Sequence, residues 1–228
     1  MSASPRRPAA GPNFFRRNAL TLVLFGLFLA IWFGQSVAGH RSYNADQHAH
    51  HEQTVSYPGY LTTSHFGEAT FENWESEFLQ MAAFVVLSIR LVQSGSPESR
   101  AVDEPIDSDE DPEPHRSDPD APWPVRRGGL SLALYRRSLS LLFLCLFLAS
   151  FLLHALTGSR AFSAEQLAHG QSRVSMWAFM TTSKFWFESL QNWQSEFLAV
   201  GSLVLATVWF RQQGSPQSKP VHASRTAG

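Results

Sequence analysis

The sequence contains a single cysteine, Cys145, which lies in the middle of an apolar run. One cysteine cannot form an intrachain disulfide or a Cys-x-x-Cys metal knuckle, so both are excluded. Charge is also scarce, because only 16% of the residues are charged and the formal net charge is −1. With no basic face or stripe, nothing indicates nucleic-acid binding.

Catalytic motifs are absent as well. The chain has no Gly-x-Ser-x-Gly, no His-Glu-x-x-His and no phosphate-binding loop. We therefore expect a protein without enzymatic activity and without a cofactor. His154, near one end of an apolar segment, is interpreted as a packed interfacial residue rather than a general base.

Long apolar runs are what the sequence has in abundance. Residues 19–38 and 139–156 hold few polar side chains, and about 20 helical residues cross the roughly 30 Å hydrocarbon layer of a bilayer. Two shorter runs, 78–92 and 197–210, become long enough if they begin near residues 71 and 190. We predict four membrane spans, at about 18–38, 72–92, 138–157 and 191–210.

The first run also resembles a cleaved signal peptide, because Arg16-Arg17 precedes it and Ser36-Val37-Ala38 ends it. The matching run at 139–156 is internal and cannot be a signal peptide. Because the same arrangement occurs twice, we expect residues 19–38 to form a membrane helix that is not cleaved.

The distribution of Lys and Arg predicts the orientation of the chain. Fourteen of these residues lie before the first and third spans or near and beyond the ends of the second and fourth, on the side of the termini and the central linker. Only four lie in the two hairpin loops: Arg41, Arg160, Arg173 and Lys184. Arginine outnumbers lysine 16 to 2, which indicates a GC-rich bacterial genome. We expect a multi-pass protein of the bacterial inner membrane with both termini in the cytoplasm.

The two halves of the chain are copies of one module. A shift of 119 residues aligns 27–99 with 146–218, with 28 identities in 73 positions. Each copy has two spans, so the copies keep one orientation and form a parallel repeat. The expected fold is all-α, a four-helix transmembrane bundle built from two tandem two-span repeats.

The domain organisation follows from the repeat. We expect a disordered cytoplasmic amino terminus at 1–13, repeat 1 at 14–97, repeat 2 at 126–216 and a disordered tail at 217–228. Residues 98–125 are acidic and poor in apolar side chains, so we predict a disordered cytoplasmic linker. Each external loop is expected to hold a short helix, capped by Ser56 or Ser175.

The Asn-Trp-x-Ser-Glu-Phe block occurs once in each repeat. Its glutamates, Glu77 and Glu196, lie one helical turn after Asn73 and Asn192, on the same helix face. These four residues are the candidate ion or proton site, since a carboxylate inside a span is costly unless it is paired or hydrated. The alternative is structural, because both carboxylates lie near a helix amino terminus.

Two further sets of residues have predicted roles. Trp74 and Trp193 lie where interfacial anchors belong, at the level of the lipid headgroups. His48, His50 and His51 are candidate metal ligands in the first external loop, because imidazole binds transition metals. Only His50 has a histidine counterpart in the second loop, His169.

These blocks, with the Gly-Ser-Pro-x-Ser exits and the Asp-Pro-Asp-Ala-Pro-Trp-Pro-Val-Arg-Arg-Gly-Gly stretch, resemble a bacterial membrane family known as a domain of unknown function. The resemblance covers roughly 13–220 and implies a four-span membrane protein, with no activity or site residues attached.

Three functional hypotheses remain open. The first is a non-enzymatic membrane protein with a structural, accessory or stress-related role. The second is a small cation or proton conductor that uses Glu77 and Glu196, and the third is a metal-binding protein that uses the first loop. The lipid bilayer is an expected partner in each, with a second copy or another membrane protein as a further partner.

Overall fold

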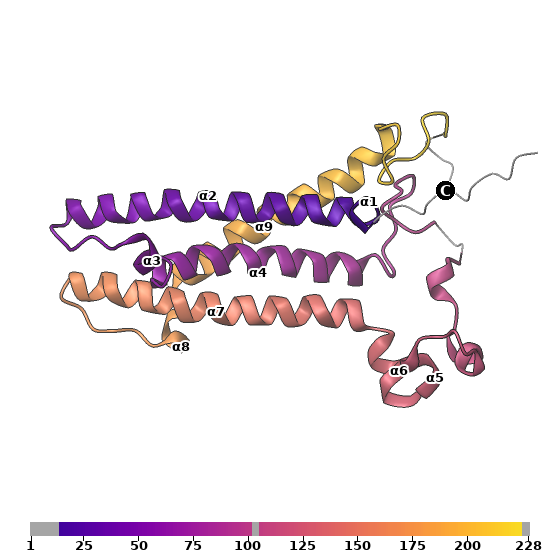
Figure 1. Cartoon of the computed structure of the whole chain (residues 1–228), viewed down its shortest axis with the longest axis horizontal. Helices are drawn as coiled ribbons and strands as arrows, with labels where there is room; N and C mark the ends of the chain where they lie inside the picture. The colour runs from indigo at the N-terminus through magenta and orange to yellow at the C-terminus, as the bar shows by residue number, and fades with distance from the viewer. Residues whose placement is uncertain (1–13, 102–104, 225–228) are drawn as a thin grey trace, which may run out of the picture. The chain divides into compact units, whose positions relative to one another are not determined.

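The computed structural model describes residues 14–101 and 105–224, and its regular structure in these ranges is entirely helical. Four long helices carry most of it: α2 (Ala19–Ala49), α4 (Ser64–Leu87), α7 (Ser138–Ala168) and α9 (Ser183–Trp209) (Figure 1). The all-α prediction is confirmed. The predicted amino-terminal segment 1–13 and the last four residues of the predicted tail lie outside the described ranges.

Helices α2 and α7 have 31 residues each and are rich in Leu, Phe and Ala. Their apolar side chains surround the helix instead of forming one stripe, and most of them are exposed. Within the described ranges, these are the two helices long and apolar enough to cross a membrane. Both continue past the predicted spans, which end at residues 38 and 157.

Helices α4 and α9 begin at the serine of the sequence Thr-Thr-Ser. The hydroxyl of Thr182 caps α9 by accepting from the backbone N–H of Phe185 at 3.3 Å, and Thr63 accepts from Phe66 at 3.2 Å in the same way. The first halves of both helices combine polar and aromatic side chains. Buried side chains of α4 include Thr70, Glu75, Ser76 and Gln80.

A short helix lies between the long helices of each half, as predicted. Ser56 caps α3 (Tyr57–Tyr60) by accepting from the N–H of Gly59 at 3.3 Å. Ser175 caps α8 (Met176–Phe179) by accepting from the N–H of Ala178 at 3.2 Å. Both predicted caps are confirmed.

The helices of the second half repeat those of the first at the spacing of the sequence repeat. The starts of α2, α3 and α4, at residues 19, 57 and 64, correspond to the starts of α7, α8 and α9, at residues 138, 176 and 183. The Gly-Ser-Pro-x-Ser blocks form matching turns after α4 and α9, with Gly95 and Gly214 at φ of 87° and 84°. This correspondence is what a duplicated module requires.

Short helical pieces occupy the connection between the halves. They are 3₁₀ turns at Asp107–Asp109 and Glu113–Ser117, followed by α5 (Trp123–Arg127) and α6 (Gly129–Tyr135). Ion pairs join Arg100 to Asp109 at 2.5 Å and Arg136 to Asp111 at 2.8 Å. Most residues of this connection are exposed. The disorder predicted for residues 98–125 stays a prediction.

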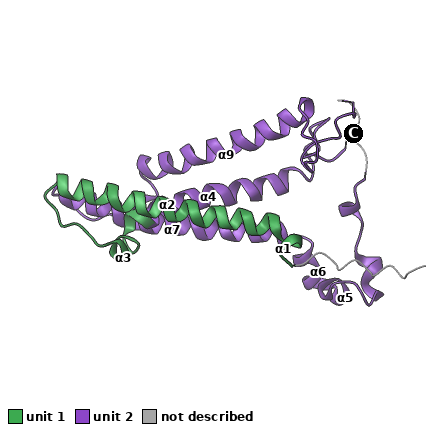
Figure 2. Ribbon diagram, turned by 45° about the horizontal axis from the view of Figure 1, so that its top comes forward, with its two compact units in different colours: residues 1–66 green, residues 67–228 purple. Residues whose placement is uncertain are grey.

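The chain divides into two compact units, residues 1–66 and residues 67–228 (Figure 2). The first contains α1 (Phe14–Arg17), α2 and α3, and Tyr60 is its main buried side chain, 2% exposed. The core of the second is formed by Ala155, Phe179 and Phe185. The boundary falls inside α4, so almost all of that helix belongs to the second unit.

Candidate functional site: a buried histidine–carboxylate cluster

His154 is a fully buried histidine on the apolar helix α7, inside the second unit. Its Nδ1 lies 3.1 Å from Oε2 of Glu75 on α4, and its Nε2 lies 3.4 Å from Oε2 of Glu188 on α9. An ionised carboxylate can only accept, so the imidazole N–H groups donate in these contacts. One histidine therefore connects three helices through polar contacts.

Glu75 is also fully buried, and both of its oxygens have partners. Oε2 faces His154, and Oε1 accepts from the indole Nε1–H of Trp193 at 3.2 Å. Burial of a charged group is costly unless it is paired and hydrogen-bonded. These two contacts supply that pairing and fix the orientation of the carboxylate.

Lys184 and two more carboxylates extend the site along α4 and α9. The ammonium group of Lys184 forms an ion pair with Oε1 of Glu188 and lies 3.8 Å from Oε1 of Glu68. Glu72, half-buried on α4, offers a carboxylate oxygen within 4.8 Å of ligand atoms of both His154 and Glu188. We call Glu68, Glu72, Glu75, His154, Lys184 and Glu188 the histidine–carboxylate cluster.

The ionisation of three cluster members reflects these contacts. Burial raises the pKa of Glu68 to about 7, and the nearby Glu188 adds to the effect while Lys184 opposes it. Burial also opposes ionisation of Glu188, but its hydrogen bonds from His154 and Lys184 outweigh this and lower its pKa. Burial disfavours the Lys184 cation, yet the bond to Glu188 raises its pKa.

The cluster contains more negative than positive groups. Four carboxylates face only two groups that can carry positive charge, His154 and Lys184. With every member ionised, two negative charges remain uncompensated. Such a site favours the uptake of protons or of a cation.

The surroundings of His154 are aromatic and closely packed. Its ring stacks on that of Phe185, with centroids 5.0 Å apart. Among the described residues, two buried side-chain oxygens have no hydrogen-bond partner, Oε1 of Glu68 and Oγ of Ser189, which follows Glu188 in the chain. Buried polar atoms without hydrogen bonds are uncommon, so these two mark an incompletely satisfied polar region.

The four residues of the sequence-predicted ion site lie outside this cluster. Glu77 is exposed and Glu196 half-buried, and neither carboxylate has a hydrogen bond or ion pair within the described ranges. The amides of Asn73 and Asn192 donate to backbone carbonyls one turn earlier, those of Ala69 and Glu188. The idea that Glu77 and Glu196 form a site stays a prediction.

The predicted tryptophan anchors have different environments. Trp74 packs edge-to-face against Phe71, with ring centroids 5.7 Å apart. Trp193 holds the buried Glu75 and contacts the rings of Phe147 and Trp186. Trp193 is therefore part of the cluster's support.

The loop histidines lie at the end of α2 and are exposed. His50 contacts Asp46 at 3.4 Å on the surface, and His51 adopts a positive φ of 60° where the second copy has Gly170. Among residues 14–101 and 105–224, the one group of three potential ligands within metal-binding range is Glu72, His154 and Glu188. The loop histidines are not brought together in this way.

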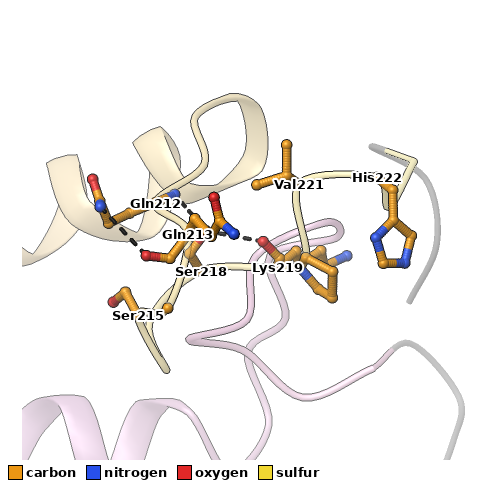
Figure 3. A pocket seen from close by; sticks show the side chains of 9 residues that line it. Gln212, Gln213, Ser215, Ser218, Lys219, Val221 and His222 are labelled. Atoms are coloured by element: carbon orange, nitrogen blue, oxygen red, sulfur yellow. Dashed lines mark hydrogen bonds between the residues drawn. The ribbon is translucent and has the colours of Figure 1, made fainter.

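A surface hollow lies in the segment after α9, far along the chain from the cluster. Gln212, Ser215, Ser218 and Lys219 are among its lining residues, and the N–H of Gln212 donates to Oγ of Ser218 at 2.9 Å (Figure 3). The same turn after α4 has the N–H of Gln93 bonded to Ser99 at 2.8 Å. The hydrogen bond beside the hollow is thus a feature of the repeated exit turn.

Together these features define an all-α protein with two helices able to cross a membrane and a buried polar cluster on three helices. The chain belongs to the family described as a domain of unknown function, DUF6766, which matches residues 11–228. No curated protein and no solved structure matches the chain.

Proposed function

We propose that this chain is a non-enzymatic, multi-pass membrane protein that binds a cation in the histidine–carboxylate cluster. The observation that carries the proposal is the complete burial of His154 between Glu75 and Glu188. An ionisable group inside an apolar span is a functional-site hypothesis by default. The excess of carboxylates gives the site the charge that a cation needs.

The membrane assignment rests on α2 and α7. A helix that is apolar all round belongs in a protein core or in lipid, and the apolar side chains of both helices are largely exposed. We extend the proposal to α4 and α9, whose second halves are apolar, which makes four spans. The low content of Lys and Arg in the two hairpin loops supports external loops and cytoplasmic termini.

This orientation places the cluster at the outer ends of its spans. Residues 72–75 begin the second proposed span, His154 lies near the end of the third, and Glu188 precedes the fourth. Protons or ions from outside therefore reach the cluster without crossing the whole bilayer.

A thermal-unfolding panel on the detergent-purified protein tests the proposal. The panel varies pH from 5 to 8 and adds monovalent or divalent cations to the wild type and to His154→Gln. The substitution is conservative for this module, because Gln35 occupies the equivalent position in the first copy. A ligand that binds only the folded state raises stability by RT ln(1 + [L]/Kd), so a cation or a proton should stabilise the wild type more than the variant.

The competing function is purely structural, with the cluster serving to lock α4, α7 and α9 together. Apolar side chains of similar volume can replace many buried ion pairs without loss of stability, so a structural lock does not require this chemistry. If His154→Gln lowers the melting temperature but responds to every cation and pH as the wild type does, the structural role holds and cation binding is wrong.

A further inference from the structure

We propose that the cation is a divalent first-row transition-metal ion, held by a carboxylate oxygen of Glu72, Nε2 of His154 and a carboxylate oxygen of Glu188. This inference rests on the proposed function and specifies its ligand. It places the metal in the buried cluster and not at the loop histidines.

The three ligands come from three helices and already lie close together. The ligand atoms of Glu72 on α4, His154 on α7 and Glu188 on α9 all lie within 4.8 Å of one another. Ligands about 2.0–2.2 Å from a tetrahedral ion are roughly 3.4 Å apart. The Nε2 of His154 and Oε2 of Glu188 are 3.4 Å apart, which matches this spacing, and a carboxylate oxygen of Glu72 lies within 4.8 Å of both ligands.

The other ring nitrogen of His154 has the partner that a metal-bound histidine needs. Histidine ligands almost always donate their second N–H to a carboxylate, a carbonyl or water, which fixes the tautomer and ring orientation. Here Nδ1 faces Glu75, whose other oxygen is held by Trp193 at 3.2 Å. Once a metal ion displaces the Nε2 proton, the Nε2 lone pair is directed to the side where Glu72 and Glu188 lie.

Glu72 is the least satisfied carboxylate of the three. Within the described ranges, its side chain has no hydrogen bond or ion pair, although it is half-buried beside His154 and Glu188. In the part of the chain that the structure describes, Oε1 of the nearby Glu68 also has no hydrogen bond, and its contact is the Lys184 ammonium group at 3.8 Å. A bound ion with its coordinated water gives these groups the partners that the protein does not.

The ligand chemistry selects the class of metal. Two carboxylates and one imidazole suit Zn²⁺, Fe²⁺ or Mn²⁺, whereas Mg²⁺ and Ca²⁺ prefer oxygen ligands alone. The only cysteine, Cys145, is exposed and takes no part in the cluster, so soft thiolate chemistry is excluded there. Two ionised carboxylates also neutralise a divalent charge.

Zinc titration of the detergent-purified full chain tests the site, with binding measured by calorimetry. His48→Ala, His50→Ala and His51→Ala are introduced first, because exposed histidines capture zinc on their own. In this background we expect one zinc ion per chain. Glu72→Gln should weaken binding at least tenfold without lowering the melting temperature in the absence of metal, because within the described ranges Glu72 has no hydrogen bond or ion pair to lose.

Two further variants complete the test: one changes Glu75, which supports the ligand His154, and the other is a control at an exposed glutamate. Glu75→Gln should weaken zinc binding about 10- to 100-fold through the orientation of His154. Glu165→Gln, an exposed position on the same helix as His154, should bind zinc as the background protein does. Competition by excess Mg²⁺ should have no effect.

Two results would overturn the inference: no zinc binding to the background protein, or equal binding by Glu72→Gln and Glu165→Gln. If zinc does not bind but protons or monovalent cations still stabilise the wild type over His154→Gln, the metal is wrong and the proposed function stands. If neither metal ions nor protons distinguish the wild type from His154→Gln, both proposals are wrong.

Discussion

Glu75 shows at the scale of one residue how the cluster is held. Its two oxygens accept hydrogen bonds from different helices, Oε2 from His154 on α7 and Oε1 from Trp193 on α9. Since Glu75 is fully buried, water cannot replace either partner. The loss of this carboxylate leaves the buried Nδ1 of His154 and the indole N–H of the half-buried Trp193 without this acceptor.

The substitution Glu75→Ala should therefore be much more destabilising than Glu75→Gln. The alanine variant removes the acceptor of His154 Nδ1 and of Trp193 Nε1 and leaves His154 paired with Glu188 alone, which costs about 3–5 kcal/mol. Glutamine keeps an acceptor oxygen and should cost about 1–3 kcal/mol. Equilibrium unfolding in detergent measures both variants, and equal losses would show that the side-chain volume of Glu75 matters rather than its hydrogen bonds.

Glu68, which precedes the second proposed span, should make stability depend on pH. Burial raises its pKa from 4.5 to about 7, so the folded state retains a proton that the unfolded state releases. This contribution to the unfolding free energy is fully present below pH 4.5 and is lost as pH rises through 7. It amounts to at most about 3 kcal/mol.

The variant Glu68→Gln isolates this effect from the groups that face Glu68, which are Glu72, His154, Lys184 and Glu188. The wild type should lose stability relative to Glu68→Gln between pH 5 and pH 8, measured as unfolding free energy at each pH. A constant difference across that range would contradict the raised pKa.

At the scale of elements, α2 and α7 each contain a glycine that lets a short helix pack closely against the long one, α3 against α2 and α8 against α7. A Cβ at Gly39 of α2 would lie 2.3 Å from the hydroxyl of Tyr60, which ends α3. A Cβ at Gly158 of α7 would lie 2.6 Å from Cε1 of Phe179, which ends α8. The contact is made independently in each unit, by equivalent residues of the repeat.

Gly158→Ala should destabilise the protein by about 1–3 kcal/mol, because the buried Phe179 ring must shift in a packed core. Gly201→Ala on α9 is the matched control, since a Cβ at Gly201 would meet no atom within 4 Å. Alanine favours a helix over glycine by up to about 1 kcal/mol, so this variant should be neutral or more stable. Equal destabilisation of the two variants in thermal unfolding would contradict the packing account.

The elements could be predicted from the sequence because their signals are local. Apolar runs, the Ser56 and Ser175 caps and the repeat spacing each depend on neighbouring residues. The cluster could not be found in this way, because the repeat draws attention to the glutamates shared by both copies. Its members occur where the copies differ: Gln35 is the counterpart of His154, and Gln194 that of Glu75. Their partnership depends on how separate helices pack.

At the scale of the whole molecule, the account requires external hairpin loops and a cytoplasmic linker. Replacement of the single cysteine by Cys145→Ser allows one new cysteine to report each location. A membrane-impermeant maleimide applied to intact cells should label His51→Cys in the first loop and not Ser108→Cys in the linker. The reverse pattern would contradict the orientation given by the Lys and Arg distribution.

The central claim is that the buried cluster, and not the glutamate pair shared by the repeats, binds the cation. The direct test compares the cation-induced shift in melting temperature of Glu72→Gln/Glu188→Gln with that of Glu77→Gln/Glu196→Gln. The account predicts that the first double variant loses the shift seen in the wild type and that the second retains it. If Glu77→Gln/Glu196→Gln loses the shift and Glu72→Gln/Glu188→Gln retains it, this claim is wrong and the cation site is at Glu77 and Glu196.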